Sequence, residues 1–110
     1  MDKDDVFITI NHIEDFCGYS HLRVGDELML RKDPDNRYDD EAIAVYDDSD
    51  MKIGYVANSV HSVARGTYSA VRLYDRMEHV SGCTVRFIIE ENGLAIAKIS
   101  KYQIEKQRNQ

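Results

Sequence analysis

The sequence predicts a small, mainly β protein: an OB-like or modified barrel of six strands, with short α structure inserted after the fourth strand. Three observations support this fold class. Six short runs are rich in β-branched and aromatic residues. Turn-forming residues separate most of these runs, and the stretch between the fourth and fifth has helical spacing. Because a barrel hides its strand edges, we prefer it to a two-sheet sandwich, the main alternative.

The first four strands are expected at residues 6–10, 27–32, 42–46 and 51–56. Leu28 and Leu30 alternate with more polar neighbours, as in a strand with one buried face. Asp33-Pro34 ends that strand in a chain reversal, because proline fixes φ and nearby Asp and Asn side chains bond the backbone. The polar run 47–50 is typical of a hairpin loop, and Gly25-Asp26 closes the irregular connection that precedes the second strand. A β-meander follows from these spacings.

Residues 58–77 change to three-residue spacing, which predicts two short helices. Asn58 or Ser59 is a suitable cap for the first, Gly66 interrupts it, and Thr67 precedes the second. Strands over 83–89 and 94–99 complete the barrel. Asn92-Gly93 predicts a hairpin between them, since both residues tolerate positive φ.

The length of 110 residues predicts one domain, with a core over about residues 5–100 and a polar tail at 101–110. Cys17 and Cys83 are too few for a disulfide scaffold, which favours a reducing cytoplasm. Apolar runs are too short to span a membrane. The acidic start of the sequence is unlike a signal peptide. We therefore expect a cytoplasmic protein with no membrane partner; the sequence leaves its oligomeric state open.

The net charge of −6 is the wrong sign for a nonspecific polyanion binder. The charge is uneven, however. Residues 33–50 hold eight acidic side chains and one basic side chain, a balance of −7, so the rest of the chain sums to +1. A nucleic-acid site would have to be a local pocket. The same acidic segment supports an alternative function, a protein-interaction adaptor that presents this face to a basic partner.

No pattern in the sequence indicates catalysis, a metal or a cofactor. The histidines and cysteines lack zinc-finger spacing, and the aspartates after residue 33 fail the EF-hand pattern because Tyr38 stands at its glycine position. The glycines form no phosphate-binding loop, and neither cysteine has an identifiable activating group. We therefore expect a noncatalytic protein.

The most specific signal is the ordered stretch from Gly25-Asp26 through Asp33-Pro34-Asp35-Asn36-Arg37-Tyr38-Asp39 and Ala42-Ile43 to Gly54-Tyr55. This stretch resembles the HIRAN family, whose members carry Gly-Asp, Asp-Pro-x-Asn-x-Tyr-Asp, Ala-Ile and Gly-Tyr in this order. One departure is Arg37, which stands where a proline is common and which loosens the turn.

The resemblance implies an OB-like barrel that binds single-stranded DNA and, in some members, captures a free 3′ end. In those members the domain is fused to a helicase-like ATPase that remodels replication forks. Small independent bacterial relatives also occur, and this sequence resembles them. The implied partners are therefore a single-stranded DNA 3′ end and a helicase-like ATPase or another repair protein.

The resemblance also implies site residues. Tyr38 matches an aromatic beside the terminal nucleotide, where a phenol ring stacks on any base. Asp39 matches the carboxylate that accepts a hydrogen bond from the 3′-hydroxyl, a group that would repel a 3′-phosphate. Tyr55 matches a ring near the bound strand. Asn36 either contacts the terminal group or closes the turn, and we favour the turn.

Structural roles are open for each of these residues. Tyr38 could only cover the barrel mouth, Asp39 could only bond turn amides, and Tyr55 could only fill a cross-strand position. The family's binding strip also includes aromatics before the second strand, where Phe16-Cys17-Gly18-Tyr19 stands; the motif does not fix its register, and Tyr19 is the candidate. Cations near the acidic patch are candidate phosphate contacts whose default role is solubility: Arg31, Lys32, Arg37 and Lys52.

Overall fold

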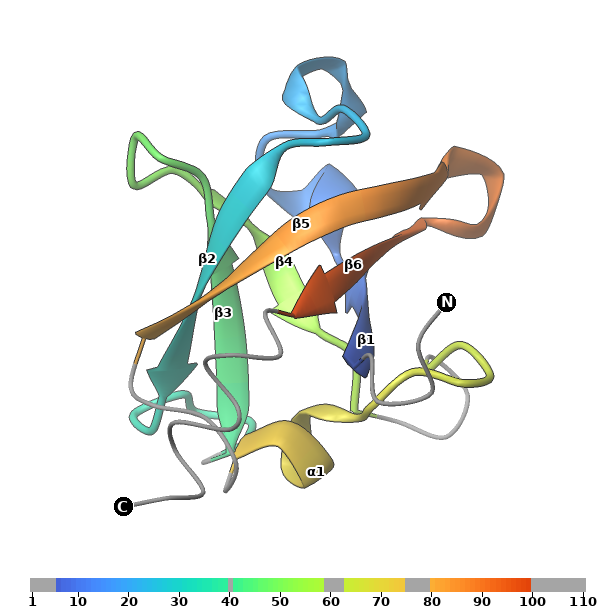
Figure 1. The fold of residues 1–110 in the computed structure, drawn as a ribbon. Helices are drawn as coiled ribbons and strands as arrows, with labels where there is room; N and C mark the ends of the chain where they lie inside the picture. Colours follow the sequence, from blue (N-terminus) through green and yellow to red (C-terminus); the bar gives the residue numbers. More distant parts are fainter. Residues whose placement is uncertain (1–5, 40, 59–62, 75–79, 100–110) are drawn as a thin grey trace.

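The computed structural model describes residues 6–39, 41–58, 63–74 and 80–99, and these form a closed antiparallel barrel (Figure 1). The strand order is β1-β4-β3-β2-β5-β6, and β6 pairs back with β1. The strands are β1 Val6–Asn11, β2 Glu27–Asp33, β3 Ala42–Tyr46, β4 Lys52–Val56, β5 Val80–Ile89 and β6 Leu94–Ile99. The predicted six-stranded barrel is confirmed, in place of the sandwich.

Short helical elements occupy the connections. They are the 3₁₀ helices η1 Ile13–Asp15, η2 Tyr19–His21 and η3 Glu90–Asn92, and the α-helix α1 Ala70–Tyr74. The α1 helix lies at one end of the barrel and buries Ala70 and Leu73, which confirms the helical insertion after the fourth strand (Figure 1). The first of the two predicted helices falls largely on residues 59–62, outside the described residues; residues 63–67 form a bend and a turn.

Four strand boundaries and one turn differ from the sequence prediction. β1 ends at Asn11 and β2 at Asp33, each one residue later than predicted. β4 begins one residue late because Met51 belongs to the hairpin loop, where its N–H donates to Asp47 Oδ1 over 2.9 Å. β5 begins three residues early because Val80 pairs with Arg31 of β2. The β5–β6 hairpin uses η3 and a left-handed Gly93 at φ 71°, whereas Asn92 does not have a positive φ.

β1 closes the barrel, and its seam with β4 is short. Only Ile10 and Asn11 pair with β4, opposite Val56 and Tyr55. Beyond them, two backbone N–H groups bond the free carbonyls of β1: Ala57 donates to Thr9 over 2.8 Å and Tyr68 donates to Phe7 over 2.7 Å. The segment that follows β4 therefore completes the edge that β4 leaves open.

Gly54 makes the seam sterically feasible. A Cβ atom at this position would lie 2.3 Å from the carbonyl oxygen of Asn11 and 3.2 Å from Ile10 Cγ2. Two backbones therefore approach so closely that only glycine fits, and this accounts physically for the glycine that precedes Tyr55.

The barrel interior is apolar. Its fully buried side chains come from all six strands and include Ile8, Leu30, Ile43, Ile53, Val85 and Ile99. Cys83 also lies in this core, where burial raises the pKa of its thiol to about 12, while Cys17 is half-buried at its margin. Among the described residues, no helix has both the length and the apolar character needed to cross a bilayer.

Substituting Gly54 with alanine should lower the free energy of unfolding by about 2–3 kcal/mol, because the new methyl group meets a backbone carbonyl that cannot rotate away. Denaturant unfolding measures this loss. The control is Gly93→Asn, which keeps a left-handed turn conformation that Asn tolerates and should lower it by less than about 1 kcal/mol. Equal losses for the two variants would contradict the steric explanation.

The two thiols should differ in reactivity toward a disulfide reagent at pH 8. Cys17 should react with the native protein, whereas Cys83 should react only as the protein unfolds, because at a pKa near 12 roughly one thiol in ten thousand is ionised. The Cys17→Ser variant should retain only the slow thiol. Fast labelling of that variant without denaturant would contradict the packing of Cys83.

Candidate functional site

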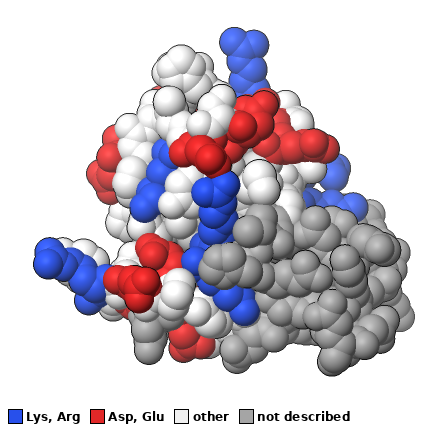
Figure 2. Space-filling model, turned by 90° about the vertical axis from the view of Figure 1, so that its left-hand side faces the viewer, with Lys and Arg blue, Asp and Glu red and all other residues white. Residues whose placement is uncertain are grey.

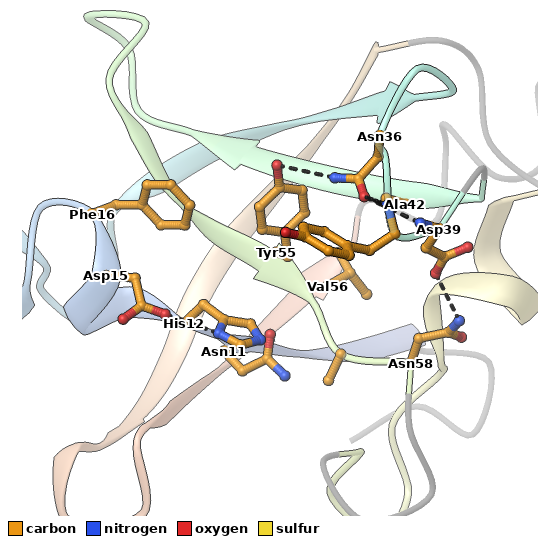
Figure 3. A pocket seen from close by; sticks show the side chains of 12 residues that line it. Asn11, His12, Asp15, Phe16, Asn36, Asp39, Ala42, Tyr55, Val56 and Asn58 are labelled. Carbon is orange, nitrogen blue, oxygen red and sulfur yellow. Dashed lines mark hydrogen bonds and ion pairs between the residues drawn. The ribbon is translucent and has the colours of Figure 1, made fainter.

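A pocket of about 370 Å³ opens where the end of β1, the β2–β3 turn and the end of β4 meet (Figure 3). Its wall combines aromatic rings with amide, imidazole and carboxylate groups. The lining residues are Asn11, His12, Asp15, Phe16, Asn36, Tyr38, Asp39, Ala42, Tyr55, Val56, Ala57 and Asn58. Ligand pockets in proteins commonly measure about 300–1,000 Å³, so this one has room for a group the size of one nucleotide.

Asn36 organises the β2–β3 turn. Its backbone N–H donates to Asp33 O over 3.1 Å, and its side-chain Oδ1 accepts the N–H groups of Tyr38 at 2.9 Å and Asp39 at 3.1 Å. Its Nδ2 donates to Asp33 Oδ2 and to Tyr55 Oη over 3.3 and 3.4 Å. These bonds hold the turn although position 37 carries an arginine in place of a proline. They leave Tyr38 with 88% of its surface exposed.

Asp39 is fixed at the polar end of the pocket. Its Oδ1 accepts the N–H of Glu41 over 2.9 Å, and its Oδ2 accepts Asn58 Nδ2 over 3.1 Å (Figure 3). The Asn58 amide is oriented in turn, because its Oδ1 accepts the N–H of Val71 in α1 over 2.9 Å. A carboxylate offers about four acceptor positions, so Asp39 retains capacity for a donor that enters the pocket.

Tyr55 and Phe16 form the aromatic end of the pocket. Their ring centroids are 5.8 Å apart with a tilt of 54°. Tyr55 Oη donates to Asp33 Oδ2 over 3.3 Å and accepts Lys52 Nζ over 3.0 Å, and Lys52 also lies 5.4 Å from the centroid of the Phe16 ring. The hydrogen bond from Lys52 to Tyr55 raises the pKa of Lys52, so this side chain is a cation at neutral pH.

His12 and Asp15 form the remaining wall. His12 follows β1 in the left-handed conformation, with φ 60° and ψ 22°, and this conformation turns the chain into η1. Its Nδ1 lies 3.0 Å from Asp15 Oδ2. The imidazole is exposed and lines the pocket, and which of its nitrogens donates or accepts a hydrogen bond depends on the tautomer.

The structure brings together four of the sequence-predicted site residues in this pocket: Asn36, Tyr38, Asp39 and Tyr55. Lys52 lies beside the pocket, against Tyr55. Arg37 is exposed on the β2–β3 turn and does not line the pocket. Tyr19 is elsewhere. It packs against the core, and its hydroxyl is buried with no hydrogen-bond partner among the described residues. Burial also raises the pKa of Tyr19.

Sequence reasoning did not select the residues that β1 and the end of β4 contribute. Phe16, rather than Tyr19, is the aromatic from the stretch before β2 that reaches the pocket. Asn11, His12 and Asp15 reach the pocket because β1 pairs with β4, and a β-meander does not imply this pairing. Asn58, selected only as a helix cap, lies three residues after Tyr55 and lines the pocket.

One face of the molecule carries both signs of charge. On the face formed largely by β2 and β3, acidic and basic side chains are interspersed (Figure 2). Arg31 illustrates this balance, since it pairs with Asp50 and lies 4.5 Å from the centroid of the Tyr46 ring. In the described parts of the chain, no three His, Cys, Asp or Glu side chains are grouped to hold a metal ion.

Comparisons with known proteins agree with this fold. The family model of the HIRAN domain matches residues 6–92. The crystal structure of the HIRAN domain of human HLTF is similar, with a TM-score of 0.65 and 14% identity over 94% of this chain and 84% of that one. A crystal structure of a Lactobacillus plantarum protein has a TM-score of 0.61 and 18% identity, over 86% of this chain and 88% of that one.

No curated protein matches the sequence. The family match nevertheless covers most of the chain, and the barrel agrees with it. The chain therefore belongs to the HIRAN domain family, a family of DNA-binding modules.

Proposed function

We propose that this chain binds single-stranded DNA by enclosing the 3′-terminal nucleotide, as a noncatalytic cytoplasmic module in DNA repair or replication-fork processing. The observation that carries the proposal is the meeting of Tyr38, Asp39 and Tyr55 around one pocket. The free cysteines agree with a reducing compartment. The proposed partner proteins are a helicase-like ATPase or another repair protein.

The two ends of the pocket suit the two parts of a nucleotide. Tyr38 offers a phenol ring to solvent, and a ring that is free on its faces can stack on a base. Phe16 and Tyr55 add apolar surface at that end, although their contact with each other and with Lys52 restricts the faces they present. The sugar would then point toward Asp39 and Asn58.

Asp39 is the residue that would distinguish a free 3′-hydroxyl from a 3′-phosphate. Its carboxylate already accepts two hydrogen bonds, and a 3′-hydroxyl can donate a third. A 3′-phosphate has no hydroxyl proton to give at that position and carries negative charge, so the same carboxylate repels it. Discrimination between a 3′-hydroxyl and a 3′-phosphate therefore depends on the negative charge of Asp39 and not on the identity of the base.

The adaptor hypothesis receives less support from the geometry. Four carboxylates of the acidic segment are already used within the fold: Asp33, Asp39, Asp47 and Asp50. Asp47, for example, accepts the N–H groups of Ser49 and Met51 at the hairpin tip. These carboxylates keep further acceptor positions, but their orientation is set by the fold.

Oligonucleotides that end in a 3′-hydroxyl should bind at least tenfold more tightly than the same sequences ending in a 3′-phosphate, measured by fluorescence anisotropy. Asp39→Asn should remove most of this preference, because the amide no longer repels the phosphate. Asp48→Asn changes the net charge equally at an exposed loop position and should keep the preference. Equal binding of both oligonucleotides by the unmodified protein would end the 3′-end hypothesis, and no binding would end the DNA hypothesis.

Tyr38→Ala should weaken binding by the value of one base stack, about 1–3 kcal/mol, while Tyr38→Phe should bind nearly as the unmodified protein does. Because Tyr38 is exposed, neither change should alter the free energy of unfolding by more than about 0.5 kcal/mol. Titration and thermal unfolding of the same samples separate the two effects. Unchanged affinity in Tyr38→Ala would show that the ring does not contact the base.

A further inference from the structure

A second hollow lies beside the pocket, between the turn at residues 64–67 and α1. Its volume is about 340 Å³. The lining includes the cations Arg65 and Arg72 and the hydroxyl-bearing residues Thr67 and Ser69, and none of its described residues is acidic. In a chain of net charge −6, this concentration of positive charge is local and suits an anion.

The turn that carries Arg65 is anchored to the barrel. Thr67 N–H donates to Ala64 O over 3.0 Å, and Gly66 takes the positive φ of 89° that this turn requires. Ala64 N–H donates to Thr9 Oγ1 over 3.0 Å, and Thr9 Oγ1 lies 2.8 Å from Thr67 Oγ1. Thr9 is fully buried in β1, so the position of the turn is set by the barrel.

Arg72 is held by its neighbours. Its guanidinium carbon lies 4.0 Å from the centroid of the Tyr68 ring, a cation–π contact. Its backbone N–H donates to Ser69 Oγ over 3.3 Å. Among the described residues, neither Arg72 nor Arg65 forms an ion pair with a carboxylate. Both cations are therefore available to a ligand in this part of the structure.

Asn58 connects the hollow to the pocket, because it lines both. Its Nδ2 bonds Asp39 on one side (Figure 3). Its Oδ1 accepts the N–H of Val71 on the other. In a nucleotide, the 3′-hydroxyl and the 5′-phosphate are attached to the same sugar. A nucleotide whose hydroxyl meets Asp39 thus carries its phosphate on the other side of one sugar, and Asn58 lies between the two hollows.

We propose that this hollow is a phosphate subsite that binds the backbone phosphate on the 5′ side of the terminal nucleotide, with Arg65 and Arg72 as its cations. The inference rests on the proposed function. A guanidinium fork matches two phosphate oxygens, so two such groups can hold one phosphate firmly. This placement explains how an acidic chain could retain a polyanion: charge is supplied at one linkage rather than over a broad face.

The test measures the binding of a ten-nucleotide oligothymidylate with a free 3′-hydroxyl. The variants are Arg65→Gln, Arg72→Gln and the double variant that combines them. The double variant should bind at least tenfold more weakly at low salt. Its slope of log affinity against log salt should fall by about 0.7, the value for one phosphate of a single strand. Arg86→Gln, an exposed arginine on β5, is the matched control and should change neither quantity. Thermal unfolding checks each variant, and Arg65→Gln alone alters only an exposed turn position.

A chemical probe identifies the phosphate. A neutral methylphosphonate at the last linkage before the 3′ end should weaken binding to the unmodified protein and have little further effect on the double variant. The same replacement near the 5′ end should weaken both proteins equally. If the unmodified protein binds the oligonucleotide but the double variant binds it as tightly as Arg86→Gln does, the phosphate subsite is wrong while the proposed function stands. The same conclusion follows if the losses of affinity from the double substitution and from the methylphosphonate simply add. If the unmodified protein binds no oligonucleotide, both fail.

Discussion

The closure of the barrel at Gly54 is the constraint on which the rest of the structure depends. β1 and β4 approach until the Asn11 carbonyl occupies the space where any other residue would place its Cβ atom. That approach sets Asn11 opposite Tyr55 and brings η1, with Phe16 just beyond it, against the end of β4. The pocket is therefore a product of barrel closure, since its walls come from strands that are distant in sequence.

A connected set of polar side chains then fixes the shape of the site. Asp33, Asn36, Tyr55 and Lys52 share hydrogen bonds, and Asp39 and Asn58 extend the arrangement toward α1. Groups that are already oriented lose little conformational freedom when a ligand arrives. The turn thus serves two purposes at once: the bonds that hold its backbone also aim Tyr38 outward and Asp39 inward.

Local sequence patterns predicted most of the fold. The β3 and β6 boundaries matched because apolar runs end at clear turn residues, and the Asp33-Pro34 reversal follows from backbone chemistry. β5 was predicted short because its first residues, including Gly82, gain their strand conformation from pairing with β2 rather than from their own preference.

The site was only partly predictable for a related reason. The family motif marked one wall through Asn36, Tyr38, Asp39 and Tyr55, whereas the opposite wall depends on which strand follows β4 around the barrel. Tyr19 and Phe16 are three residues apart, and no periodicity in that irregular stretch indicates which ring faces the pocket. Tertiary packing made that choice, placing Tyr19 against the core.

The closed sheet also restricts how other proteins can attach to this module. Recognition by strand addition needs an unpaired backbone edge. Each described strand has a neighbour on both sides, and Ala57 and Tyr68 bond the stretch of β1 that β4 does not reach. A protein that binds this module would therefore contact its loops and side chains, because the hydrogen-bonded frame of the described barrel offers no open strand edge.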